Sequence, residues 1–140
     1  MTQDATTAEG VETSAPMGAL MLAALTGTMA MMAFVAIVGP LVRRLELPEW
    51  VAGLSVTTGG LLWMLLARRW GGMGDRHGRK PVLVVGFAAF ALVYLALAYG
   101  IDLALRRDIT AAAALVLLVV ARGLVGAFYA AVPPTAAALV

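Results

Sequence analysis

Four long stretches of this chain carry almost no charged residues, and they leave few folds open to it. They are residues 13–42, 50–67, 81–101 and 109–140, the last interrupted only by Arg122. Each stretch exceeds or approaches the roughly 20 helical residues that are needed to cross a hydrocarbon core of about 30 Å. The sequence therefore predicts an all-α membrane protein with four transmembrane helices, near residues 17–39, 50–67, 81–101 and 111–134.

Composition supports this class of protein over the alternatives. Apolar residues make up 62% of the chain and charged residues 13%, whereas soluble domains contain about half and about a quarter. The stretches show no apolar and polar alternation and are rich in Ala, Leu and Met, which argues against β-barrel strands. Residues 1–16 carry three acids and no Lys or Arg, so we expect a disordered tail there and not a cleaved signal peptide.

The distribution of basic residues predicts the orientation in the membrane. Five of the ten Lys and Arg residues lie between the second and third predicted helices: Arg68, Arg69, Arg76, Arg79 and Lys80. Short loops that are rich in Lys and Arg face the cytoplasm. We therefore expect residues 68–80, and with them both ends of the chain, to be cytoplasmic.

Glycines and charges cluster in residues 71–80 of this loop. The glycines allow the backbone to turn tightly, and Asp75 can pair with Arg79 if the segment is helical. Such a loop can act as a latch against a neighbouring helix. The alternative is that its basic residues only set the topology and bind anionic lipid. A phosphate-binding loop is a poor match, because no Ser or Thr follows Lys80.

Arg122 is the only ionisable side chain within a predicted helix. It lies roughly 16 Å from the start of that helix at about 1.5 Å per residue. A charge at such depth costs about 2.5–3.5 kcal/mol on insertion scales, so Arg122 should face a cavity, water or a partner acid. It could release a proton from a nearby carboxylate or bind an anionic substrate, or it could serve packing alone by bonding carbonyl groups. None of the predicted helices contains Asp or Glu.

The string Gly71-x-x-x-Asp75-Arg76-x-Gly78-Arg79-Lys80 resembles the signature loop of the major facilitator superfamily. That resemblance implies a conformational latch. Asp75 would hold the cytoplasmic end of a helix in the other half of a transporter, and Arg79 would join the same charge relay. Together they would stabilise the outward-facing state.

A second string, Leu118-x-x-x-Arg122-x-x-x-Gly126 followed by Ala130, resembles the arginine motif of proton-coupled drug antiporters in that superfamily. It implies that Arg122 and Gly126 take part in substrate binding or proton coupling. Because transporters of this superfamily have twelve helices in two halves, the 140 residues would supply the first third of the fold, as a truncated N-terminal part.

The resemblance implies secondary active transport, with proton-coupled efflux of a small organic compound by alternating access in a bacterial plasma membrane. The expected partners are the lipid bilayer, the remaining helices beyond residue 140, a small-molecule substrate and protons. Two alternatives stay open: uptake or exchange of a sugar or anionic metabolite, and a non-transporting four-helix protein that serves assembly or regulation.

Other classes find no support in the sequence. We expect no enzymatic activity and no cofactor, because no nucleophile and base pair, metal cluster or cofactor loop is present. The chain has no cysteine, which excludes thiolate metal sites. No basic patch with interleaved aromatic residues indicates a nucleic acid partner.

Overall fold

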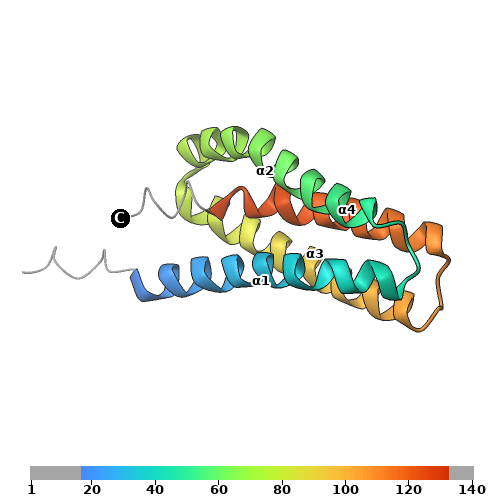
Figure 1. Ribbon diagram of the computed structural model, residues 1–140. Helices are drawn as coiled ribbons and strands as arrows, with labels where there is room; N and C mark the ends of the chain where they lie inside the picture. Colours follow the sequence, from blue (N-terminus) through green and yellow to red (C-terminus); the bar gives the residue numbers. More distant parts are fainter. Residues whose placement is uncertain (1–16, 133–140) are drawn as a thin grey trace, which may run out of the picture.

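Four helices make up the computed structural model, which describes residues 17–132 (Figure 1). They are α1 (Met17–Arg44), α2 (Trp50–His77), α3 (Arg79–Leu105) and α4 (Ala111–Tyr129). All four are long and apolar enough to cross a membrane, which confirms the predicted all-helical class and fits an integral membrane protein. The expectation of a disordered tail at residues 1–16 lies outside the described residues.

The helices alternate in direction because every connection between them is short. The α1–α2 and α3–α4 connections lie at one end of the molecule, here called the turn end (Figure 1). The α2–α3 connection lies at the other end, the junction end, where α1 also begins and α4 finishes. This up-and-down order is the arrangement expected of four spans with short loops.

Three helices continue beyond the boundaries that the sequence predicts. The largest difference is at α2, which was expected to stop at Ala67 and runs on to His77. The predicted boundaries followed the first charged residues, but charges outside the hydrocarbon are solvated and do not break a helix. At about 1.5 Å per residue, 28 residues span roughly 42 Å, so α2 is longer than the hydrocarbon core is thick. Residues 68–77 are therefore helical, and not a loop as the sequence suggested.

Gly78 alone separates α2 from α3. Its φ angle is +88°, in a region that side chains disfavour and that glycine enters freely.

The helix α4 is shorter than predicted and ends at Tyr129. A turn at Ala130 follows it, with Ala130 N bonded to Gly126 O and Ala131 N to Phe128 O.

The two turns at the turn end share one backbone pattern. At each, a residue after the helix has a positive φ: 56° at Glu46 and 61° at Arg107. The N–H of the next residue bonds back to the helix, from Leu47 to Val42 and from Asp108 to Leu103. Both turns are therefore Schellman motifs, which satisfy the last carbonyl groups of a helix. In both motifs a residue other than glycine occupies the position where glycine is usual.

Glycines bring α2 and α4 into backbone contact. A Cβ atom added to Gly126 would overlap the carbonyl group of Gly59, and one added to Gly123 would lie 2.8 Å from the side chain of Leu62. Small residues at such contacts are typical of membrane helices, where close packing replaces the hydrophobic effect as a driving force. Of the helix pairs, α2 and α4 make the most extensive close approach, and α3 packs on the same helix α4.

The interior is apolar except for Ser55 and Arg122, and the outer surface is largely apolar too. Phe34, Val51, Leu97, Leu118 and Val125 are buried at the centre. Large hydrophobic side chains such as Met21, Leu92 and Leu95 are exposed. An exposed apolar surface of this extent suits contact with a lipid bilayer.

Candidate functional site

Arg122 lies in the middle of the bundle and is almost completely buried, with 3% of its surface exposed. Its Nη1 donates a hydrogen bond to the Sδ atom of Met31 on α1, at 3.0 Å. Its guanidinium carbon lies 5.0 Å from the centre of the Phe34 ring, within range of a cation–π interaction. On the other side, Gly59 of α2 leaves room for Arg122: a Cβ at Gly59 would lie 3.1 Å from the Arg122 carbonyl oxygen.

The charge on Arg122 has no acidic partner among residues 17–132. The five carboxylates of this part of the chain are all exposed and lie near helix ends or in turns: Glu46, Glu49, Asp75, Asp102 and Asp108. The Nε atom of Arg122 is buried without a hydrogen-bond partner, and the thioether that Nη1 contacts is only a weak acceptor. A buried cation with so few hydrogen-bond partners is costly, and this makes Arg122 a candidate functional residue.

Aromatic side chains of α3 and α4 cluster beside the part of α1 that contacts Arg122. Phe90 of α3 is at the centre, with ring centroids of Phe87 and Tyr94 each at 5.7 Å and that of Tyr129 at 5.3 Å. Their tilted geometry is typical of favourable aromatic pairs. This aromatic cluster lies next to α1, which carries Met31 and Phe34.

Two tyrosines of this cluster attach α1 to the rest of the bundle. The Tyr94 hydroxyl donates to the Ala30 carbonyl oxygen at 2.6 Å, and the Tyr129 hydroxyl lies 2.8 Å from the Thr28 hydroxyl. Together with the contact between Arg122 and Met31, these polar contacts to α1 all fall within residues 28–31. These contacts hold Met31 and Phe34 against the guanidinium.

Gly126, predicted to act with Arg122, lies one helical turn beyond it and faces α2 instead of the guanidinium. The backbone of Gly59 occupies the space where a Gly126 side chain would be. The structure thus gives Gly126 a packing function, while its predicted part in coupling stays a prediction. The same contact positions Gly59 against Arg122, so the two predicted residues are linked through α2.

The predicted latch residues lie at the junction end. Asp75 Oδ1 and Arg79 Nη2 are 3.7 Å apart, with 71% and 43% of these side chains exposed, so the pair spans the break at Gly78 as the spacing suggested. Such an exposed pair contributes little to stability. Arg76 and Lys80 are exposed as well. A Cβ at Gly71 would meet no other atom, which leaves that surface open.

Trp70 connects the segment that carries the predicted latch residues to α4, a contact that the sequence does not reveal. Its Nε1 donates to the carbonyl oxygen of Ala127 at 2.8 Å, and its ring lies 6.2 Å from that of Phe128. Trp70 directly precedes Gly71, and Ala127 directly follows Gly126. The two predicted sites are therefore separate, but one hydrogen bond joins the segments that carry them.

The turn end holds a second feature that the sequence did not reveal. Arg107 Nη2 donates to Glu46 Oε1 at 2.6 Å and ties the two Schellman turns together. The hydrogen bond and the charge of Arg107 lower the pKa of the Glu46 carboxyl, and Glu46 likewise raises the pKa of Arg107.

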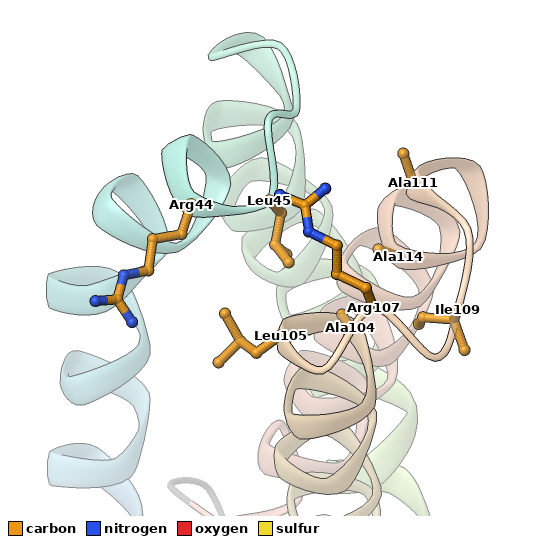
Figure 2. A pocket seen from close by; sticks show the side chains of 8 residues that line it. All are labelled: Arg44, Leu45, Ala104, Leu105, Arg107, Ile109, Ala111 and Ala114. Atoms are coloured by element: carbon orange, nitrogen blue, oxygen red, sulfur yellow. The ribbon is translucent and has the colours of Figure 1, made fainter.

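A small cavity of about 70 Å³ lies beside this pair. It is lined by Arg44, Leu45, Ala104, Leu105, Arg107, Ile109, Ala111 and Ala114. Figure 2 shows Arg107 reaching toward the α1–α2 turn, while the guanidinium of Arg44 points away from that turn. Its lining combines six apolar residues with Arg44 and Arg107, and Glu46 already engages Arg107.

No group of three or more His, Cys, Asp or Glu side chains within residues 17–132 is placed to hold a metal ion. Comparisons with protein-family models, with curated proteins and with solved structures found no match to the chain. The buried Arg122 is therefore the candidate site, and its function has to be inferred from its surroundings.

Proposed function

We propose that this chain forms the first four helices of a secondary active transporter of the major facilitator type. The observation that carries the proposal is Arg122, a cation buried at the centre of four membrane-length helices and in contact with a side chain of α1. Ionisable groups placed in this way mark ion and substrate pathways in membrane proteins. The signature string at residues 71–80 and the arginine string ending at Gly126 support the same assignment.

The transport cycle in this proposal is proton-coupled efflux of a small organic compound in a bacterial plasma membrane. The junction end faces the cytoplasm, in keeping with its basic residues. The remaining transporter helices, a small-molecule substrate and protons are the partners. Asp75 and Arg79 act as a latch that stabilises the outward-facing state, and their exposure is what a contact with a further helix requires.

The packing of the four helices fits movement of α1 against its neighbours within this half of the proposed transporter. Glycine contacts unite α2 and α4, so these two helices move together. In contrast, α1 is attached to α3 and α4 through long side chains, which change rotamer more easily than backbones separate. Arg122 lies between the two parts and is positioned to sense their separation.

Transport in proteoliposomes tests this function. Vesicles that hold the protein with its full set of transporter helices should accumulate or release lipophilic test compounds when a proton gradient is imposed. Arg122→Ala should abolish gradient-driven flux, and Arg122→Lys should retain part of it because it keeps the charge. Normal flux in the Ala variant would return Arg122 to a packing role. Absence of flux in the unmodified protein, for cations and anions alike, would favour the non-transporting alternative.

A further inference from the structure

The environment of Arg122 indicates the charge of what it binds. A buried guanidinium needs a compensating negative charge, and unpaired burial is what makes such a group costly. All five carboxylates among residues 17–132 are exposed, and the guanidinium of Arg122 contacts a thioether and an aromatic ring. The described part of the chain therefore supplies the cation of an ion pair without supplying its anion.

The unused hydrogen-bonding capacity of Arg122 indicates which anion fits. The Nε atom is buried and unpartnered, and Nη1 is engaged only by Met31. A carboxylate pairs with a guanidinium through two parallel hydrogen bonds, which is the geometry that Arg is best suited to provide. Methionine has three rotatable bonds and fills irregular space, so the Met31 thioether can move aside for a stronger acceptor.

The surroundings indicate the rest of the ligand. Phe34 lies against the guanidinium, and Phe90, Tyr94 and Tyr129 form a cluster beside the segment of α1 that contacts Arg122. Tyr94 and Tyr129 direct their hydroxyl groups to Ala30 and Thr28, which leaves their rings as apolar surface. Aromatic surface of this kind favours an apolar or aromatic body over a sugar, whose hydroxyl groups would need polar partners.

We propose that Arg122 binds the carboxylate of a small organic anion with an apolar body, and that Met31 is displaced when the anion enters. The proposal deepens the function given above, since it names the class of substrate, and its place in transport rests on that function. Binding of the anion does not rest on the proposed transport function, because it requires only the site between α1 and α4.

Benzoate binding to the 140-residue chain in lipid nanodiscs is the test, with benzamide as the neutral control of the same shape. The measurement is the nitrogen and proton NMR signal of Arg122 Nε, together with equilibrium dialysis of labelled benzoate. We expect a saturable shift of the Nε signal with benzoate and none with benzamide. Sodium chloride at equal concentration should not reproduce the shift. Full competition by chloride would overturn the assignment to carboxylates.

Three variants sharpen the test. Arg122→Gln should weaken benzoate binding at least tenfold, and Arg122→Lys should weaken it as well, because Lys keeps the charge and loses the planar fork. Met31→Leu removes the competing thioether at similar volume, so its binding should equal or exceed that of the unmodified chain. Benzoate binding that is equally strong in Arg122→Gln, or absent from the unmodified chain, would overturn the proposal.

The proposed function and the anion site can fail separately. Benzoate binding without gradient-driven flux in the transport assay would leave the site standing and remove the transporter. Flux of lipophilic cations without benzoate binding would leave the transporter standing and remove the anion site. Should Arg122→Gln fail to insert, the Nε shift in the unmodified chain still decides the outcome.

Discussion

Glu46 and Arg107 occupy equivalent positions in two Schellman turns, both with positive φ, and their side chains form an ion pair across the turn end. Each residue directly follows the residue that caps the helix, at the position where a Schellman motif takes a positive φ. Glycine would relax the backbone at either position, so side chains are retained there at a conformational cost. The pair joins the hairpin of α1 and α2 to the hairpin of α3 and α4.

The pair should make stability depend on pH. Arg107 lowers the pKa of Glu46 in the folded protein below its usual 4.5, so the contribution of Glu46 is present above that value and is lost as pH falls through the folded pKa. Because both side chains are exposed, the effect should be small. Thermal unfolding in detergent between pH 7 and pH 3 should show a larger loss for the unmodified chain than for Glu46→Gln. Identical pH profiles would show that the pair adds nothing.

Gly126→Ala should loosen the contact between α2 and α4. The added methyl group would overlap the carbonyl of Gly59, and overpacking of this kind costs about 1–3 kcal/mol. Gly60→Ala is the matched control, since a Cβ there meets nothing within 4 Å and alanine favours helix by roughly 0.5–1 kcal/mol. The free energy of unfolding in mixed micelles measures the effect of both substitutions. Equal stability of the two variants would contradict the close backbone approach.

Trp70→Phe should weaken the attachment of the latch region to α4. It removes the Nε1 hydrogen bond to Ala127 and keeps most of the ring, so we expect a loss of about 0.5–1.5 kcal/mol. Amide hydrogen exchange should rise in the last two turns of α2. The control is Trp63→Phe, because Trp63 is on the exposed surface. A similar change in both variants would assign the effect to loss of the indole in general.

If the chain has the proposed transport function, Asp75→Asn should reduce transport in the protein that carries the full set of helices, without affecting membrane insertion. The substitution removes the charge of a side chain that is 71% exposed, so folding of this chain has little dependence on it. Flux in proteoliposomes and the insertion yield are the two measurements. Asp108→Asn, at the opposite end, is the control for loss of one negative charge. Undiminished flux in Asp75→Asn would remove the latch role.

The sequence predicted the four helices well because hydrocarbon thickness sets a length that apolar runs reveal directly. It placed the end of α2 wrongly, because charged residues show where the hydrocarbon stops and not where a helix stops. Gly78 was the real boundary, and its positive φ depends on geometry that composition does not encode.

The candidate site was predictable only in part. Arg122 is conspicuous as the one ionisable residue in a predicted helix, and its burial follows from that position. Its neighbours could not be predicted: Met31 is 91 residues away in sequence, and nothing distinguishes it from the other methionines of α1. The Glu46 and Arg107 pair was hidden for the same reason, since it depends on how the two hairpins are aligned. Whether the residues at 71–80 act as a latch stays a prediction.

The contacts that hold α1 also determine how that helix can move. The polar contacts gather within residues 28–34, near the middle of α1, and Val38, Leu41 and Val42 add apolar burial closer to its end. The end at Arg44 lies roughly 15 Å beyond Phe34 at about 1.5 Å per residue. A tilt of about 10° would therefore displace that end by about 3 Å while the polar contacts within residues 28–34 stay in place. Glu46, two residues further along, is bonded to Arg107 and opposes that swing. The ion pair at the turn end therefore restrains this tilt of α1. Protonation of Glu46, or its displacement from Arg107, would release the restraint.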